Sequence, residues 1–257
     1  MQLRGIRHPT RLVPVVFLLA ILCGTVLLAL PVAREGAGSA PLITALFTAT
    51  STVAVTGLIT VDTGTYWSPF GQVIILVLFQ IGGFGIMTAA TLLGLVAGRG
   101  FRLSNRLLTQ TERNRLETGD AVGVLKLVFA ITLIVELAVA AALSLRFRFG
   151  YSQSWAEAAW NGGFHAVSAF NNAGFSIFSD SLMGFQSDAV VLVPIMLAVV
   201  ITALGFPVMQ EVRMRALEPR AWSLHTKITV SGTIILLIIG FVAILRQNGV
   251  IQPRSAR

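Results

Sequence analysis

The hydrophobic positions of this chain form long apolar runs rather than the alternating or one-sided patterns of soluble proteins. A helix needs about twenty apolar residues to cross a hydrocarbon core of roughly 30 Å. We expect five runs of that kind to be transmembrane helices: residues 12–31, 70–97, 122–145, 189–208 and 228–245. The pattern therefore predicts an all-α membrane protein.

Two segments between these runs interrupt the helical pattern. Residues 41–50 (PLITALFTAT) predict an apolar helix too short to cross a bilayer, and the stretch TSTVAVTGLITVDTGTYW, small, hydroxylated and with a glycine, covers residues 50–67. The same order returns 117 residues later, where NGGFHAVSAFNNAGF (161–175) aligns with TALFTATSTVAVTGL (44–58). This alignment places Gly174 opposite Gly57.

The repetition predicts tandem units of an outer helix, a short pore helix with a filter loop, and an inner helix. We expect a first repeat over residues 1–120, a second over 121–226, and the outer helix of a third over 227–257, each complete repeat including its cytoplasmic loop. Internal repeats in membrane chains are typical of a pore or transport path, where irregular backbone is shielded from lipid.

The glycine-bearing breaks have a physical use. Carbonyl oxygens without intrahelical partners cost several kcal/mol each in hydrocarbon, and a partly dehydrated cation can be coordinated by them. The short helix also directs its negative end toward the break. Alternatively, these stretches are re-entrant connections or extracellular turns, because Asn, Gly, Ser and Thr are common turn residues. The ordered repetition favours an ion filter.

Composition and charge agree with a membrane location. The chain is 55% hydrophobic and only 12% charged, and its net charge of +8 is concentrated in three places: before the first run, after the second and after the fourth. Cytoplasmic segments carry such an excess of Lys and Arg, so we expect the amino terminus inside and no nucleic-acid partner. A secretory signal is the alternative reading of the first run, but the run is long for one.

Motifs for catalysis do not occur in the sequence. It has no Walker loop, nucleophile elbow or zinc signature, so we expect neither an enzyme nor a metal site beyond a transported ion. Glu136 lies inside a predicted span and is either functional or satisfied by a neighbouring helix, which we favour; His165 is expected to pack or hydrogen-bond within the second short helix. A discontinuous-helix carrier of another cation or small solute is the alternative function.

The two glycine-bearing stretches resemble those of a known family. TVAVTGLITVDTGTYWSPFGQ is similar to the first filter, and FHAVSAFNNAGFSIFSDSLMGF to the second filter, of the Trk/Ktr/HKT superfamily of potassium transporters, in particular the bacterial Trk and Ktr membrane subunits. The resemblance implies filter backbone at Val55, Thr56, Gly57 and Leu58 and at Asn172, Ala173, Gly174 and Phe175. Asp62 and Asp180 follow the two filters, where they either attract cations to the outer mouth or cap loop backbone.

The resemblance also implies how such a protein works. Its members move K⁺ passively into the cell, and glycine at both filter positions supports K⁺, with Na⁺ permeation left open. It implies a bacterial cell membrane protein without a covalently bound cofactor, a homodimer of full-length subunits, and a cytosolic nucleotide-binding regulatory ring that meets residues 99–120. Because the family has four repeats, either this chain is a fragment, which we favour, or two copies combine to supply four filter segments.

Overall fold

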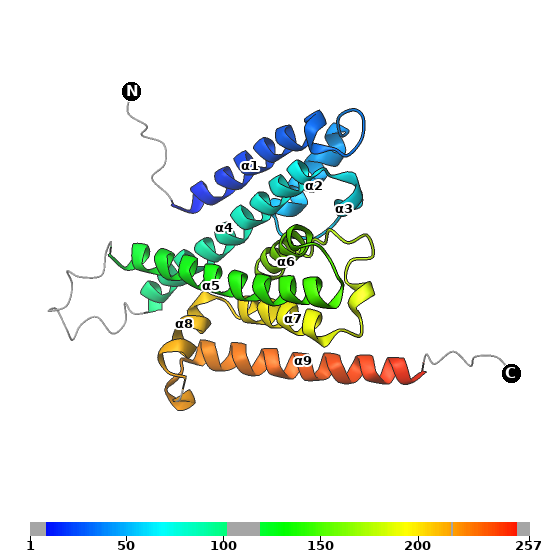
Figure 1. Cartoon of the computed structure of the whole chain (residues 1–257). Coiled ribbons are helices and arrows are strands. Elements are labelled where there is room, and N and C mark those ends of the chain that lie inside the picture. The colour runs from blue at the N-terminus through cyan, green and yellow to red at the C-terminus, as the bar shows by residue number, and fades with distance from the viewer. Residues whose placement is uncertain (1–8, 102–118, 217, 251–257) are drawn as a thin grey trace, which may run out of the picture. The chain divides into compact units, whose positions relative to one another are not determined.

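The computed structural model describes residues 9–101, 119–216 and 218–250. These residues are helical apart from connecting loops and one isolated β-bridge between Arg34 and Trp67. The elements, drawn in Figure 1, are α1 (Pro9–Leu28), η1 (Pro31–Ala33), α2 (Leu42–Val53), α3 (Thr63–Tyr66), α4 (Pro69–Phe101), α5 (Gly119–Gly150), α6 (Trp155–Phe170), η3 (Met183–Phe185), α7 (Ala189–Ala203), α8 (Phe206–Met214), η4 (Pro219–Ala221) and α9 (Leu224–Val250).

The chain forms two compact units, Met1–Ala203 and Leu204–Arg257. Helices α1 to α7 belong to the first unit, and α8 and α9 to the second. The units are not the expected repeats, whose boundaries at residues 120 and 226 stay a prediction.

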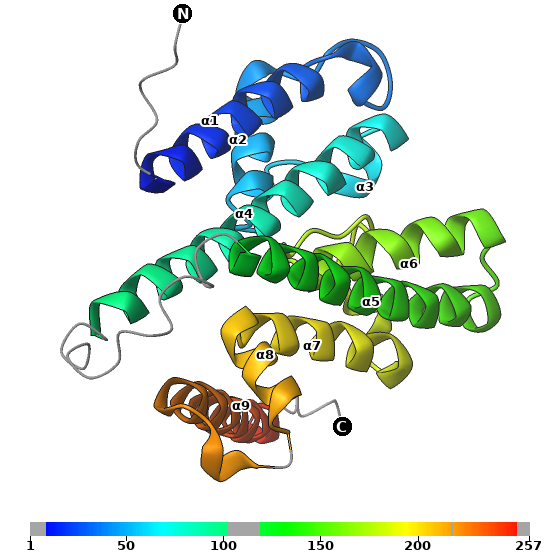
Figure 2. The same ribbon diagram turned by 90° about the vertical axis from the view of Figure 1, so that its left-hand side faces the viewer.

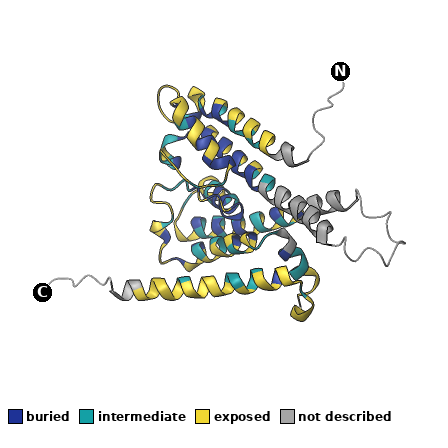
Figure 3. Ribbon diagram, turned by 180° about the vertical axis from the view of Figure 1, so that it is seen from behind, coloured by how far each residue is buried: buried dark blue, intermediate teal, exposed yellow. Residues whose placement is uncertain are grey.

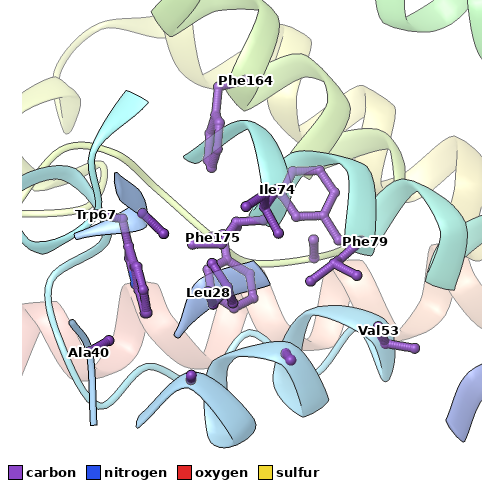
Figure 4. Packing of buried hydrophobic residues seen from close by; sticks show 14 residues of the cluster. Leu28, Ala40, Val53, Trp67, Ile74, Phe79, Phe164 and Phe175 are labelled. Carbon is purple, nitrogen blue, oxygen red and sulfur yellow. The ribbon is translucent and has the colours of Figure 1, made fainter. Parts of the chain in front are cut away.

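Helices α1, α2 and α4 pack against one another in the first unit (Figures 1 and 2). Leu28, Val53 and Phe79 are fully buried between them. Figure 4 shows Phe164 of α6 and Phe175 in the same cluster, and the Phe164 ring meets the Phe79 ring edge-on at a centroid distance of 5.6 Å. This cluster therefore joins α6, from the middle of the chain, to the first three long helices.

A second buried cluster holds α5, α6 and α7 together. Leu143 and Phe147 of α5 and Val191 of α7 are completely buried in it. Asp188 lies just before α7. Its carboxylate accepts a hydrogen bond from Arg146 Nε at 2.8 Å and another from the Tyr151 hydroxyl at 2.8 Å. These bonds fasten the end of α5 to the beginning of α7.

Two helix ends have identifiable local causes. Helix α6 begins at Trp155, where Ser154 and Glu157 form a capping box in which each side chain bonds the backbone of the other. The expected continuous run 189–208 is wrong at its end: α7 stops at Ala203, and Gly205 takes a φ of 81° before α8 starts. Glycine adopts this left-handed conformation without strain, and a proline in the first turn of α8 favours a new helix start.

Two helices of the described part of the chain are long and apolar enough to cross a membrane, over Val128–Gly150 of α5 and Leu224–Arg246 of α9. A third is added if α7 and α8 count as one broken span. In α1 and α4, the apolar stretches Pro14–Leu28 and Pro69–Gly85 are shorter than these spans. Figure 3 shows α9 mostly exposed, although its mean hydropathy is 2.7. Such an apolar surface needs lipid or other helices around it.

Candidate functional site

Two loops follow the two short helices and share one backbone conformation. Loop 1 (residues 54–58) follows α2, and loop 2 (residues 171–175) follows α6. Gly57 and Gly174 have φ values of 72° and 70°, and two residues earlier Val55 and Asn172 both have a φ of 54°. Each loop therefore enters the left-handed region at two residues, and the two residues of loop 2 lie 117 positions after those of loop 1.

The same hydrogen bonds hold both loops to their helices. Ser51 Oγ donates to the carbonyl of Leu58 at 2.7 Å, and Ser168 Oγ donates to the carbonyl of Phe175 at 2.7 Å. In addition, the backbone amide at position 56 donates to the Ser51 carbonyl at 2.9 Å, and the amide at position 173 to the Ser168 carbonyl at 2.8 Å. One serine in each helix thus closes the loop from both ends.

The carbonyl oxygens in the middle of each loop take no part in these hydrogen bonds. Among the described residues, none donates a hydrogen bond to the carbonyls of Thr56, Gly57, Ala173 or Gly174. Unpartnered carbonyls are costly away from water, and a cation or water must satisfy them. The two loops therefore carry the kind of backbone oxygens that an ion filter uses.

The two loops touch at their glycines. A Cβ atom added to Gly57 would lie 2.8 Å from the Ala173 carbonyl oxygen and 3.3 Å from the Gly174 Cα. A Cβ added to Gly174 would lie 3.4 Å from the Gly57 Cα. The expected filter glycines are thus brought together, and the absence of a side chain at residue 57 is what permits the approach.

Other glycines make close contacts around the two loops. A Cβ on Gly64, after loop 1, would collide with the carbonyl of Ile177, after loop 2. Within α4, a Cβ on Gly82 would collide with the Val53 carbonyl, and one on Gly83 with the Asn171 side chain. The α4 glycines therefore serve close packing against the ends of the two short helices.

Side chains at the start of each loop differ. Loop 1 begins with Ala54 and Val55, which have no polar side-chain atoms. Loop 2 begins with Asn171, whose Nδ2 donates to Gln80 Oε1 at 2.6 Å, and Asn172, whose Nδ2 donates to Thr202 Oγ1 at 2.9 Å. The sequence pattern showed these amides but not their partners, which lie on α4 and α7.

His165 has both ring nitrogens engaged inside the structure. Nδ1 lies 2.7 Å from the Asn161 carbonyl oxygen, and Nε2 lies 2.9 Å from Ser176 Oγ, just after loop 2. The side chain is 4% exposed. The expectation that His165 packs and hydrogen-bonds is confirmed, and the described residues contain no group of three metal-ligating side chains around it or elsewhere.

The two aspartates after the loops have different surroundings. Asp62 caps α3, where its Oδ1 accepts from the Thr65 amide at 2.8 Å and from Thr65 Oγ1 at 2.9 Å. Burial opposes its ionisation, but these hydrogen bonds hold the pKa of Asp62 below its ordinary value. Asp180 is exposed, and its carboxylate makes no hydrogen bond to any residue that the structure describes. Of the two readings, capping therefore fits Asp62, whereas the Asp180 carboxylate caps no backbone among the described residues.

A cavity of about 320 Å³ borders loop 2 but not loop 1. Asn172, Gly174 and Phe175 of the loop line it, together with Ile195 and Val199 of α7. Gly174 therefore contacts Gly57 on one side, and loop 2 also borders this cavity.

Comparison with known proteins agrees with this architecture. The TrkH family, described as cation transport proteins, matches residues 7–252. The chain is 39% identical over 238 residues, 92% of its length, to the Ktr system potassium uptake protein B of Bacillus subtilis, of which it covers 52%. It is 34% identical to the potassium/sodium uptake protein NtpJ of Enterococcus hirae, covering 94% of the chain and 53% of the relative. It is 33% identical to the Ktr system potassium uptake protein B of Vibrio alginolyticus, covering 90% and 50%.

These likenesses confirm the resemblance to Trk and Ktr potassium transporters, a family of transporters rather than enzymes. The chain spans about half the length of the curated relatives it matches. The family match covers nearly all of the chain, and the chain belongs to the TrkH family of cation transport proteins.

Proposed function

We propose that this chain contributes two segments of a backbone-carbonyl filter through which K⁺ enters the cell. The observation that carries the proposal is the pair of loops that touch at Gly57 and Gly174 and whose carbonyls at positions 56, 57, 173 and 174 accept no hydrogen bond from any residue that the structure describes. Carbonyl oxygens of this kind replace the hydration shell of a permeating ion. The filter consists of Val55, Thr56, Gly57 and Leu58 and of Asn172, Ala173, Gly174 and Phe175.

The short helices add an electrostatic reason for a cation. Both α2 and α6 end at the loops, so the negative ends of their dipoles lie beside the free carbonyls. A monovalent cation would be stabilised there, whereas an anion would be repelled. The membrane potential drives it, at about 2.3 kcal/mol per charge per 100 mV.

Other segments are needed to surround an ion completely. Leu58 of loop 1 is 62% exposed, whereas the corresponding Phe175 of loop 2 is 3% exposed and stacks on Phe79 of α4. Among the described residues, Leu58 thus lacks the cover that α4 gives Phe175. We assign this cover to the rest of a four-repeat transporter, in which residues 1–120 and 121–226 are the first two repeats and residues 227–257 begin the third.

Relatives support K⁺ as the transported ion. Two matched relatives are named as potassium uptake proteins, and one as a potassium/sodium uptake protein, so Na⁺ is the competing ion. Asp180 lies exposed after loop 2, where its charge attracts cations to the outer mouth.

The setting in the cell completes the proposal. The basic segments put the amino terminus of the chain in the cytoplasm of a bacterium, with α5 and α9 among the membrane spans. The transporter is a homodimer, and residues 99–120 meet a cytosolic nucleotide-binding ring; of these, 102–118 lie outside the described residues. Deleting 102–118 should abolish the response of transport to nucleotide and leave ion selectivity intact, and a preserved response would contradict this contact.

The filter is tested by changing one glycine in a completed transporter, in which this chain replaces the matching half of the Bacillus subtilis relative. The unchanged completed transporter should restore growth of a K⁺-uptake-deficient strain at low K⁺. Gly57→Ser places a side chain against the Ala173 carbonyl, so we expect K⁺ uptake to fall and the preference for K⁺ over Na⁺ to weaken. The measurement is the uptake of ⁸⁶Rb⁺ and of ²²Na⁺. An unchanged ratio of the two uptake rates would contradict the proposed filter.

A further inference from the structure

A chain of three polar side chains connects α5 to loop 2. Glu136 of α5 accepts a hydrogen bond at Oε1 from Gln80 Nε2 of α4, at 2.9 Å. Gln80 Oε1 in turn accepts one from Asn171 Nδ2, at 2.6 Å. The chain crosses from one outer helix to an inner helix and ends on the first residue of loop 2.

The bonds have a fixed direction. Asn171 donates to Gln80 and also to the Val167 carbonyl of its own helix, at 2.9 Å, so both amide hydrogens are used. Gln80 uses its oxygen for Asn171 and its nitrogen for Glu136, whose Oε1 accepts the bond. Glu136 therefore fixes which way the Gln80 amide faces. Reversing that amide would set its nitrogen against the donating nitrogen of Asn171.

Asn171 has little freedom to respond in another way. Its side chain is packed against Gly83, where any added Cβ would overlap it, and the residue is 5% exposed. The next residue, Asn172, has a φ of 54°, and Gly174 touches Gly57 two residues later. A displacement of Asn171 is thus passed directly to the carbonyls at positions 173 and 174. A buried polar chain of this sort defines one geometry when every member is satisfied.

We propose that Glu136 and Gln80 are positioning residues for ion selectivity: through Asn171 they set where the carbonyls of loop 2 lie. The proposal rests on the filter function proposed above and goes beyond it, because neither side chain belongs to a filter loop. It gives the carboxylate inside a membrane span a role at a distance. Loop 1 has no counterpart, since alanine stands at position 54 where loop 2 has Asn171.

Three variants of the completed transporter test this role. Glu136→Gln keeps an oxygen that can accept from Gln80, and we expect it to retain the K⁺ to Na⁺ uptake ratio. Glu136→Leu removes the acceptor, and we expect the ratio to fall roughly fivefold, about the effect of one lost hydrogen bond. The matched control is Thr132→Val, one turn away on α5, where the buried Thr132 hydroxyl donates to the Val128 carbonyl of its own helix and to no other described residue. This control should leave the ratio unchanged.

A second readout follows loop 2 itself. The Ala173 amide donates to the Ser168 carbonyl at 2.8 Å, so its hydrogen exchange reports whether the loop is held. Exchange at Ala173 in the purified completed transporter should be faster in Glu136→Leu than in Glu136→Gln or Thr132→Val. If Glu136→Leu does not fold, Gln80→Met, which keeps the length of the side chain without its amide, replaces it with the same expectation.

The outcomes separate this proposal from the filter proposal. A normal ratio and normal Ala173 exchange in Glu136→Leu, together with a weakened ratio in Gly57→Ser, would overturn the positioning role and leave the filter standing. A normal ratio in Gly57→Ser would remove the filter itself, and the role of Glu136 in selectivity with it. An equal loss in Glu136→Leu and Thr132→Val would mean a general effect of α5 packing and would also overturn the role.

Discussion

Loop 1 and loop 2 have the same backbone and different surroundings. Each is closed by a serine of the preceding helix, with hydrogen bonds that match position for position. Yet Leu58 is mostly exposed where Phe175 is buried, and only loop 2 has asparagine amides that reach other helices. The comparison teaches that local bonds with one helix suffice to define the loop conformation, whereas packing against other helices decides how firmly it is placed.

The glycines should show the largest difference between the loops. Gly57→Ala adds a Cβ 2.8 Å from the Ala173 carbonyl and forces alanine into a left-handed φ, so we expect a loss of about 2–4 kcal/mol of stability. Gly174→Ala meets only an ordinary contact at 3.4 Å and should lose about 1–2 kcal/mol from backbone strain. Thermal unfolding in detergent measures both, and a larger loss for Gly174→Ala would reverse the comparison.

The first left-handed position holds Val55 in loop 1 and Asn172 in loop 2. Placing each loop's residue in the other loop should change the stability in opposite directions. Val55 is β-branched and strained at a φ of 54°, so Val55→Asn should stabilise by about 1 kcal/mol, because asparagine tolerates this region. Asn172→Val should destabilise by about 2 kcal/mol, since it adds strain and removes the bond to Thr202. The same unfolding assay checks the signs. Two changes of the same sign would show that the positions are not equivalent.

The serines should behave alike. Ser51→Ala and Ser168→Ala each remove the hydroxyl that bonds the last loop carbonyl, and each should cost about 1 kcal/mol. Thr50→Ala is the control, because among the described residues the exposed Thr50 hydroxyl bonds the Leu46 carbonyl of its own helix alone. A large gap between the two serine variants would break the claim that the loops share one scaffold.

The aspartates after the loops should show the smallest difference. Asp62→Ala removes the cap of α3 and should cost about 0.5–1 kcal/mol, whereas Asp180→Ala should stay within about 0.5 kcal/mol of the unchanged protein. Because the pKa of Asp62 is lowered in the fold, its stabilising effect is present above pH 3.8, the unfolded value, and is lost as the pH falls through the folded pKa. Unfolding measured from pH 7 down to pH 3 checks this, and a loss that begins near neutral pH would contradict the sign.

Much of this site could be predicted from the sequence, because its signals are local. Glycine is the residue type that adopts a positive φ without strain, so its presence at positions 57 and 174 indicates such a conformation there. Both short helices appear in the sequence as apolar stretches before the breaks. Ser154 and Glu157 carry the capping-box spacing that marks the start of the second short helix, a local signal that could have located it.

Other features had no local signal. Valine at position 55 gives no hint of a left-handed φ, which the closing bonds of loop 1 impose on it. The bond between Asn171 and Gln80 joins residues 91 apart, and no periodicity reports such a pair. The end of α7 was hidden for another reason: residues 204–208 are apolar, so hydropathy continues through the glycine at 205 where the helix does not.

The cavity beside Gly174 has a consequence for water. A space of about 320 Å³ has room for several water molecules, and Ser176, Ser181 and Asn172 place polar groups on a wall that is otherwise largely apolar. On the Gly57 side, direct contact leaves no gap for a solvent molecule. Loop 2 therefore has one flank closed by loop 1 and one flank that water or another protein segment can fill, so an ion beside Gly174 would sense two different dielectric surroundings.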